Sequence, residues 1–257
     1  IAIAQDEDPA IDVQGGLAAI DALAARLKKR LAADTSALQK LRYLNRYFFH
    51  ELGFAGNIND YYTPDNSYVH RVLDTRRGIP ITLALIYIEI AQHIGLEARG
   101  VSFPGHFLIK VKMPQGEVVI DPFTGQSLSR DDLDERLAPH RRRQGLEGEY
   151  EVPLGLFLQT ATPRAILARM LRNLKEIHRD AEDWARLLKV QQRLVILLPE
   201  DWDERRDRGL VLAELGDNAA AADDLAVYLE HRSGAPDARA VAERMTELRN
   251  ASKPLLH

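Results

Sequence analysis

Hydrophobic positions recur at helical spacing through the first part of the chain. Leucines and isoleucines three and four residues apart predict a helix over residues 16–32. The run 34–36, Asp-Thr-Ser, then offers N-caps for a second helix, which reaches about Leu52 and ends at Gly53. The aromatic stripe of this second helix is interpreted as core packing, and it comprises Tyr43, Leu44, Tyr47 and Phe48.

Residues 54–66 differ from both neighbouring segments, because they are rich in Gly, Asn, Asp, Pro and Tyr. This composition predicts a loop, and a loop of this length inside a domain is often functional. Asp65 or Asn66 is placed to cap a short helix that extends to about Leu73.

The most apolar stretch of the chain, residues 81–94, predicts a buried central helix, with Pro80 in its first turn and Gly95 at its end. Because nearly every position is apolar, we expect other elements to cover it on all sides. The pattern then changes to the shorter period of β-strands. Three strands are predicted, the last two joined by a hairpin turn: 97–103, 107–113 and 117–121. The fold class expected is α+β, with a helical N-terminal part and a central helix on a small, largely antiparallel sheet.

The remaining part of the chain has a helical pattern. A short acidic helix is predicted over 131–137, and a basic, glycine-bearing loop follows at 140–148, whose three consecutive arginines are interpreted as solvated. Helices resume near Pro163, and no strand signal follows. We therefore expect two domains, residues 1–150 and 151–257, the second of them all-α.

A weak internal repeat runs through this helical tail. Pro199 and Pro236 lie 37 residues apart, and the pair at 184–185 has a counterpart at 221–222. Small or apolar residues stand where the tetratricopeptide pattern requires them, at Gly209, Gly216, Ala221 and Leu225. Repeats of this helix–turn–helix kind offer surfaces for peptides or helices of other proteins. The tail therefore predicts a protein or peptide partner.

Composition and charge narrow the classes of function. Of the 257 residues, 46% are hydrophobic and 28% are charged, which is typical of a globular protein with an ordinary buried core. Its net charge of −4 would repel a polyphosphate backbone, so we expect no nucleic-acid partner. No apolar run approaches the roughly 20 residues that span a bilayer, and the acidic start lacks the basic region of a signal peptide. We expect no membrane partner and a cytoplasmic location.

The absence of cysteine restricts the possible chemistry most strongly. It excludes disulfides, cysteine-ligated metals and cysteine nucleophiles within this sequence. The eight histidines form no His-Glu-x-x-His or His-x-His pair, and no glycine-rich nucleotide motif occurs. The sequence therefore predicts neither a metal site nor a cofactor.

Several ordered motifs resemble those of the SirB-like family, in which a transglutaminase-like domain precedes tetratricopeptide repeats. In the first domain they are the runs Arg-Arg-Gly-Ile-Pro-Ile-Thr-Leu at 76–83, Phe-Pro-Gly-His-Phe-Leu at 103–108 and Ile-Asp-Pro-Phe at 120–123. In the tail they are Asn-Leu-Lys at 173–175 and Arg-Asp-Arg-Gly at 206–209. The resemblance covers nearly the whole chain and implies a papain- or transglutaminase-like fold for the first domain.

The resemblance also implies where a catalytic triad would lie. The wider superfamily uses a cysteine at the start of the central helix, a histidine on a following strand and an aspartate or asparagine on the next one. His106 and Asp121 match the second and third members. The nucleophile's position falls among Pro80, Ile81 and Thr82, and none of these is a thiol.

Two interpretations of His106 and Asp121 stay open. They could act as a general base and its orienting carboxylate, with Thr82 or Ser102 as the nucleophile or with a directly activated water. Alternatively, they could form a structural hydrogen bond between two strands, with Thr82 serving only the first turn of the helix. We favour the structural interpretation, because an interior threonine lacks the amine that threonine nucleophiles usually need.

Other polar and aromatic residues near this site in sequence could line a groove for a peptide or acyl substrate: Tyr61, Tyr62, Asn66, Arg76 and Arg77. In the tail, Arg206 and Arg208 are interpreted, with Asp207, as an ion-pair network that joins the repeat helices. We expect a bacterial-type pseudoenzyme. It would act as a regulatory or scaffold protein through contacts with other proteins. The alternative is a cysteine-independent hydrolase or acyltransferase that uses His106 and Asp121.

Overall fold

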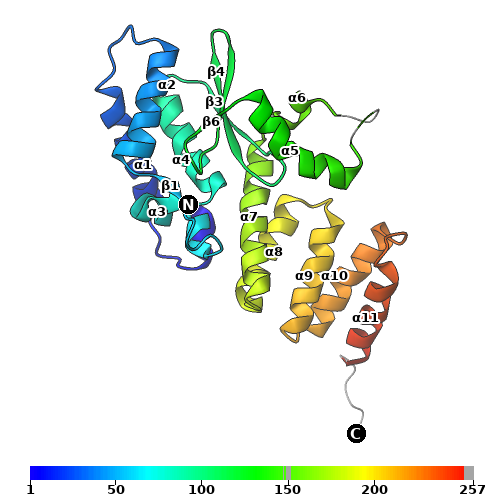
Figure 1. The fold of residues 1–257 in the computed structure, drawn as a ribbon. Helices are drawn as coiled ribbons and strands as arrows, with labels where there is room; N and C mark the ends of the chain where they lie inside the picture. The colour runs from blue at the N-terminus through cyan, green and yellow to red at the C-terminus, as the bar shows by residue number, and fades with distance from the viewer. Residues whose placement is uncertain (147, 149–151, 252–257) are drawn as a thin grey trace. The chain divides into compact units, whose positions relative to one another are not determined.

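In the computed structural model, which describes residues 1–146, 148 and 152–251, the chain separates into two units, residues 1–166 and 167–257 (Figure 1). The domain boundary expected after residue 150 falls outside the described residues. Residues 152–166 lie in the first unit, where the Ala161 N–H donates to the Gly100 carbonyl at 2.8 Å and Leu154 is buried.

The first unit contains helices and short strands in alternation. Its helices are η1 (Ala2–Asp6), α1 (Val13–Lys28), α2 (Ala37–Asn45), the π-helix η2 (Arg46–Glu51), η3 (Pro64–Ser67), α3 (Val69–Thr75), α4 (Pro80–His93), α5 (Arg130–Gln144) and α6 (Leu154–Phe157). Its strands are β1 (Ala55–Gly56), β2 (Arg77–Gly78), β3 (Ala98–Val101), β4 (Leu108–Met113), β5 (Gly116–Ile120) and β6 (Ser127–Leu128). This arrangement confirms the α+β class.

Helix α4 is the centre of the first unit, as predicted (Figure 1). Pro80 occupies its first turn, and Gly95, with φ of 77°, lies just past its end. Ten of its residues are buried, because α1 and α3 contact it as well as strands β3 and β4. An apolar helix of this kind is stable only when it is covered all round.

The main sheet is antiparallel, in the order β3-β4-β5-β6. The hairpin between β4 and β5 sets its register, with Ile109 opposite Ile120. Strand β6, which the sequence pattern did not indicate, pairs with the end of β5. A separate parallel pair, β1 with β2, leads directly into α4.

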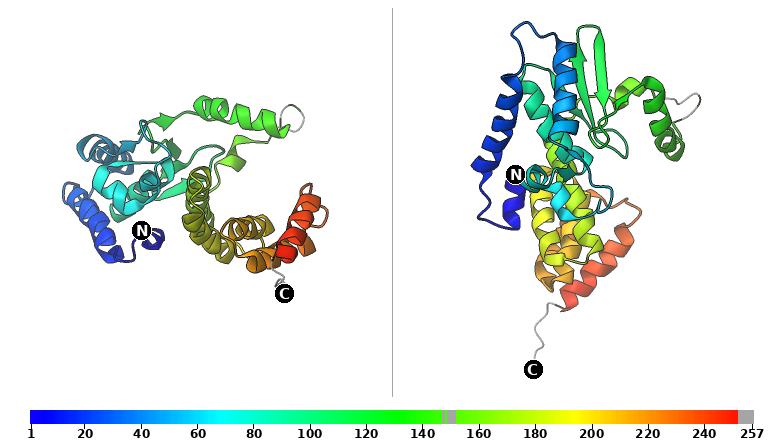
Figure 2. Two further views of the ribbon diagram at one scale, coloured as in Figure 1. Left: turned by 90° about the horizontal axis from the view of Figure 1, so that it is seen from below. Right: turned by 60° about the vertical axis from the view of Figure 1, so that its left-hand side comes forward.

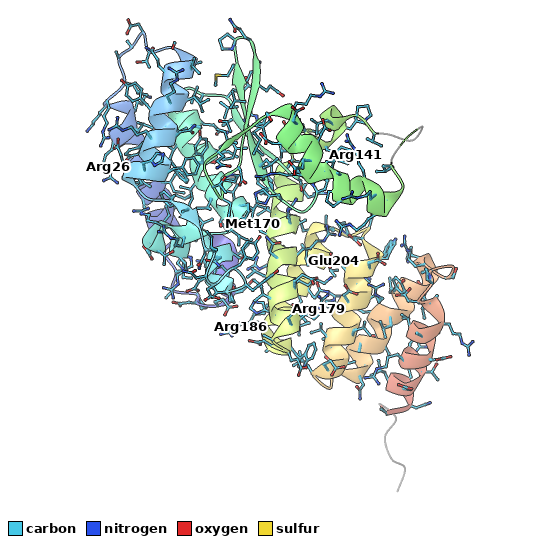
Figure 3. The ribbon with its side chains drawn as sticks, viewed as in Figure 1. Arg26, Arg141, Met170, Arg179, Arg186 and Glu204 are labelled. Atoms are coloured by element: carbon cyan, nitrogen blue, oxygen red, sulfur yellow. The ribbon has the colours of Figure 1, made fainter. Side chains whose placement is uncertain are left out.

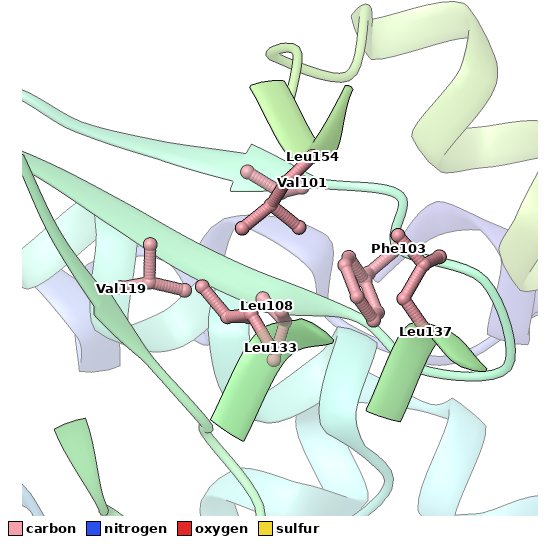
Figure 4. Close-up of a cluster of buried hydrophobic side chains, with 7 residues drawn as sticks. All are labelled: Val101, Phe103, Leu108, Val119, Leu133, Leu137 and Leu154. Atoms are coloured by element: carbon pink, nitrogen blue, oxygen red, sulfur yellow. The ribbon is translucent and has the colours of Figure 1, made fainter. Parts of the chain in front are cut away.

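The sheet buries both faces, as the alternation of side chains along its strands requires. Ile109 and Val111 are buried on one face, and α4 packs against β3 and β4. On the other face, a cluster joins the sheet to α5 and α6 (Figure 4), and its members are Val101, Phe103, Leu108, Val119, Leu133, Leu137 and Leu154. The sheet is thus packed between α4 on one face and α5 with α6 on the other.

The predictions for the segment 140–148 and for Tyr43 are wrong. The loop expected at 140–148 is largely helix, because α5 continues through Pro139 and ends where Gly145 adopts a left-handed conformation. Arg141 is accordingly not solvated: its guanidinium is buried against Asp134 and the Val152 carbonyl, at 3.0 and 3.1 Å. Tyr43 is 52% exposed, whereas the other members of its stripe are buried or nearly so.

The described residues of the second unit form helices joined by short turns. Helix α7 (Pro163–Asp180) crosses the boundary, and α8 (Trp184–Leu197), α9 (Trp202–Glu214), α10 (Asn218–His231) and α11 (Ala238–Ala251) follow it. Of these helices, α8 and α9, α9 and α10, and α10 and α11 lie side by side (Figure 2). A Cβ at Gly209 would stand 3.0 Å from the Leu225 side chain and 3.1 Å from the Ala221 carbonyl, so this glycine permits the close approach of α9 and α10. Three of the four residues singled out for the repeat, Gly209, Ala221 and Leu225, therefore meet at one helix crossing.

Candidate functional site

His106 and Asp121 are in direct contact. Asp121 follows β5 and His106 lies in the loop before β4, and these two ends adjoin because the strands are antiparallel neighbours. Nε2 of His106 lies 2.8 Å from Oδ1 of Asp121. The Asp121 side chain is 3% exposed, whereas that of His106 is 24% exposed. The pair therefore has a buried carboxylate and an imidazole that reaches solvent.

The Asp121 carboxylate accepts hydrogen bonds from two further donors. Its Oδ1 accepts the Phe123 N–H at 2.9 Å, and its Oδ2 accepts Nη1 of Arg136, on α5, at 2.9 Å. Burial by itself raises the pKa of the Asp121 carboxyl, but these donors, with His106 first among them, bring that pKa well below its ordinary value. The carboxylate stays ionised and joins the β3–β4 loop, the turn after β5 and helix α5.

The carboxylate also fixes the orientation of the imidazole. A hydrogen on Nε2 that donates to Asp121 leaves Nδ1 as the basic nitrogen of a neutral ring. No described residue hydrogen-bonds to Nδ1 of His106. This is the arrangement of a general base held by an orienting carboxylate.

The start of α4, where the superfamily places its nucleophile, offers no comparable group. Pro80 and Ile81 have no nucleophilic atom, and both are buried. Thr82 is fully buried, and its Oγ1 lies 2.7 Å from the Asn66 carbonyl oxygen and 3.0 Å from that of Ile79. The hydroxyl thus donates to backbone and ties α4 to η3.

Asn66 organises the loop before α3. It does not cap a helix, since the N-cap positions of η3 and α3 are Thr63 and Tyr68. Its buried Nδ2 donates to the carbonyls of Asp60 and Tyr61, at 2.6 and 3.0 Å, and its Oδ1 accepts from Asn57. Asn66 therefore holds the loop in place from inside.

The tyrosines of this loop extend toward the turn after β5. The ring centroid of Tyr61 lies 5.9 Å from that of Phe123 and 5.1 Å from that of Tyr62, which is 77% exposed. Phe123 in turn lies on Gly56, where a Cβ would stand 2.2 Å from its ring. Of the residues expected to line a groove, Tyr62 is therefore accessible, and it lies beside Tyr61, which in turn lies near Phe123. Asn66 is buried and not accessible.

Arg76 and Arg77 have different surroundings. Arg77 is exposed, and its Nη1 donates to the carbonyls of Gly53 and Arg76, at 2.6 and 3.0 Å. The guanidinium of Arg76 lies over the Phe54 ring, 4.6 Å from its centroid. Arg77 therefore supports the backbone, and Arg76 makes no comparable bond.

Sequence reasoning missed Arg136 and the Phe123 N–H. The Phe123 contact is local, because the Asp121 carboxylate accepts the N–H two residues further on, as in an Asx turn, and the Asp-Pro pair at 121–122 was the signal for it. The contact of Arg136 depends on how α5 packs on the sheet, and no local pattern reports this. A surface hollow of about 460 Å³ adjoins Arg136, and it is lined by Gln126, Ser127, Leu128, Asp132, Glu135 and Arg136.

The ion pairs expected in the second unit are present. Arg206 bonds Asp207 and Asp237, at 2.8 and 2.7 Å, while Arg208 forms a bidentate pair with Asp224, at 2.6 and 2.7 Å. The second pair joins α9 to α10, which confirms that this motif holds repeat helices together.

A second cluster of charges in this unit surrounds Glu204, which is nearly fully buried (Figure 3). Its two carboxylate oxygens accept from Arg172 at 2.7 Å and from Lys175 at 2.6 Å. Lys175 also reaches Asp207 at 2.5 Å, and Arg172 reaches Asp201 at 2.7 Å. These pairs tie α7 to α9.

A shallow groove of about 360 Å³ crosses α8, α9 and α10. Its lining residues are Leu188, Gln192, Arg208, Leu212, Asp217, Ala220, Asp223 and Asp224. Arg208 is neutralised by Asp224, and Asp217 caps α10 through the Ala220 N–H. Asp223 is exposed and forms no ion pair with any described residue, so the groove has apolar walls and a net negative charge.

Neither a metal cluster nor a membrane-spanning helix is found in the described parts of the chain. Over residues 1–146, 148 and 152–251, no three or more His, Asp or Glu residues are placed to hold an ion. Within the same ranges, no helix has both the length and the hydrophobicity that crossing a bilayer requires.

Comparison with known proteins gives matches along both units. Residues 15–172 match a family model described as a transglutaminase-like superfamily, and residues 174–246 match a tetratricopeptide repeat. A UPF0162 protein of Xylella fastidiosa is 37% identical over 229 residues, which cover 89% of this chain and 80% of that protein. A UPF0162 protein of Pseudomonas aeruginosa is 30% identical over 255 residues, covering 99% and 91%, and YchA of Escherichia coli is 28% identical over 226, covering 86% and 80%. No solved structure matches the chain.

Proposed function

The chain belongs to the SirB-like UPF0162 family, in which a transglutaminase-like domain precedes tetratricopeptide repeats, and on this basis we propose that it is a non-catalytic regulatory or scaffold protein of the cytoplasm. It acts through contacts with other proteins, and its helical unit supplies the contact surface. Its transglutaminase-like unit retains the base and carboxylate without the nucleophile.

The observation that carries this proposal is the environment of Thr82. Its hydroxyl, the one nucleophilic atom among positions 80–82, is buried and occupied by backbone carbonyls. A hydroxyl has a far higher pKa than a thiol, so it needs an aligned base in order to react. The first turn of α4 therefore supports a structural role for Thr82.

The groove across α8, α9 and α10 supports the binding role. Peptide grooves combine apolar contacts with a few charges that select the partner. Leu188 and Leu212 supply the apolar contacts, and Asp223 supplies an exposed carboxylate that no residue in the described ranges pairs with. The partner that fits this groove is a basic, amphipathic peptide segment.

Charge reversal in the groove is expected to abolish partner binding. The Asp223→Lys variant should capture its partners from a lysate at least about tenfold less well than the wild type, because the groove loses its complementary charge. Full-length protein serves as bait, and the captured proteins are quantified by mass spectrometry. Glu214→Lys, a matched reversal on an exposed position of α9 outside the groove, should capture them normally. Equal capture by all three proteins would contradict the assignment of this groove.

The alternative function, a cysteine-independent hydrolase or acyltransferase, rests on the contact between His106 and Asp121. A base with an open Nδ1 could activate a water molecule without any side-chain nucleophile.

We expect purified protein to show no amide hydrolysis and no transamidation on peptide and glutamine-donor substrates, because no residue among positions 80–82 can form a stabilised thiolate at neutral pH. Release of ammonia and incorporation of a labelled amine are the measurements. Turnover above background that disappears in His106→Ala would establish the alternative and refute the non-catalytic assignment.

A further inference from the structure

Arg76 occupies a backbone position that favours glycine. It ends α3 with φ of 60° and ψ of 17°, a left-handed conformation that is unfavourable for residues with a Cβ. The position is fixed, because its N–H donates to the Val72 carbonyl at 2.9 Å and its carbonyl accepts the Ala55 N–H at 3.0 Å. Glycine would adopt this backbone conformation more favourably than arginine. The presence of an arginine side chain at position 76 therefore requires a separate explanation.

The side chain of Arg76 packs against an aromatic ring, but one of its buried N–H groups has no hydrogen-bond partner among the described residues. Its guanidinium stacks over Phe54, and Nη1 is buried without a hydrogen-bond partner among the described residues. Two other arginines that are buried or half-buried pair with carboxylates, Arg141 with Asp134 and Arg208 with Asp224. Unpaired buried donors are uncommon in proteins. The Nη1 group of Arg76 therefore has hydrogen-bonding capacity that no described residue uses.

A second unpaired arginine lies near it. Arg26 is in the last turn of α1 (Figure 3), a helix that packs against α3, and it forms no ion pair with any residue the structure describes. Burial, and after it the positive charge of Arg26, lower the pKa of the Arg76 guanidinium, while Asp74 and Tyr47 act in the opposite direction. Neither Asp74 nor Tyr47 forms a salt bridge or hydrogen bond with it. The positive charge of the exposed Arg26 thus acts on the Arg76 guanidinium, and no described carboxylate bonds to either arginine.

We propose that Arg26 and Arg76 bind the phosphate group of a small soluble molecule. Guanidinium groups match phosphate oxygens in a bidentate geometry, and Phe54 holds one of them in a fixed plane. A phosphate monoester carries nearly two negative charges at neutral pH and balances both arginines, whereas a carboxylate carries one. The site is separate from the groove across α8 to α10, and it does not depend on the function proposed above.

Ligand-dependent stabilisation of the full-length protein tests this proposal, with inorganic phosphate as the probe. At a phosphate concentration tenfold above Kd, we expect Tm to rise by roughly 3 °C relative to sodium chloride of equal ionic strength. Arg76→Gly removes the guanidinium and suits the left-handed backbone, so the variant should fold and lose the rise. Arg26→Ala should lose it as well. Arg99→Ala, at an exposed arginine of β3 that pairs with no carboxylate among the described residues, should keep it.

Three results would overturn the proposal. The first is an equal rise with sodium chloride or sodium acetate, and the second is a rise that persists in Arg76→Gly. The third comes from sedimentation with phosphatidylglycerol vesicles: binding that depends on Arg76 would assign the site to a lipid headgroup rather than to a soluble phosphate. Wild-type protein that stays in the supernatant supports the soluble ligand.

Discussion

Replacing Asp121 by alanine is expected to lower the free energy of unfolding of the first unit by roughly 3 to 5 kcal/mol. The substitution leaves three donors without an acceptor, on His106, Phe123 and Arg136. It also detaches α5 from the turn after β5. Guanidinium unfolding followed by near-ultraviolet circular dichroism of tyrosine measures the loss, since seven of the eight tyrosines lie in the first 166 residues.

Two further variants make this result specific. Asp131→Ala removes an exposed acid from the first turn of α5 and should cost under about 1 kcal/mol. A double-mutant cycle of His106→Ala with Asp121→Ala should give a coupling of about 1 kcal/mol or more, because the two groups share a hydrogen bond. Strict additivity would mean that the contact contributes nothing in solution.

The contribution of Asp121 also depends on pH, with a definite sign. The pKa of its carboxyl is lower in the folded than in the unfolded protein. The folded state therefore holds the ionised form more strongly, and this stabilisation is fully present above the unfolded pKa of about 4. It is lost as the pH falls below that value toward the folded pKa. Between about pH 4 and pH 2, the wild type should lose more stability than Asp121→Asn.

Replacing Lys175 by methionine should destabilise the second unit by about 3 kcal/mol. The change leaves Glu204, whose side chain is 4% exposed, with one cation in place of two, and it deprives Asp207 of one of its partners. A buried carboxylate that loses a partner keeps its desolvation cost. Both tryptophans of the chain, Trp184 and Trp202, lie in this unit, so tryptophan fluorescence reports its unfolding separately.

The exposed ion pair between Arg239 and Glu243 provides the matched comparison. Its arginine side chain is 91% exposed, and Arg239→Ala should change stability by less than about 0.5 kcal/mol. Combining Lys175→Met with Glu204→Gln should cost less than the sum of the two single changes, because the neutral amide tolerates the missing cation. A loss in Lys175→Met no larger than that in Arg239→Ala would show that the buried cluster is not a source of stability.

The sequence permitted prediction of those parts of the site that depend on local pattern and strand order. His106 and Asp121 flank strands whose register follows from a single hairpin turn, so their proximity could be expected. Arg136 could not, because its contact with Asp121 depends on where α5 docks on the sheet. The role of Asn66 was equally hidden, since capping a helix and holding a loop require the same amide chemistry.

The errors at Tyr43 and Arg141 have physical causes as well. The buried residues of α2 are Leu41 and Leu44. At 3.6 residues per turn, Tyr43 lies about 100° around the helix from Leu44 and still further from Leu41, so it lies outside the buried face. Arginine is usually exposed, so the sequence predicts a solvated Arg141. Its burial depends on Asp134, two turns earlier on the same face of α5, and on the Val152 carbonyl from beyond the helix.

The packing of Phe123 on Gly56 restricts the order in which these two positions can change during evolution. A methyl group at residue 56 would overlap the ring, so Gly56→Ala is incompatible with phenylalanine at 123. The reverse order is open, because a smaller residue at 123 leaves space that a side chain at 56 can then occupy. The Phe123 N–H that Asp121 accepts is a backbone group, and it survives the exchange of the ring for a smaller side chain. Evolutionary replacement of the side chains around the Asp121 carboxylate therefore begins at position 123 and reaches position 56 only afterwards.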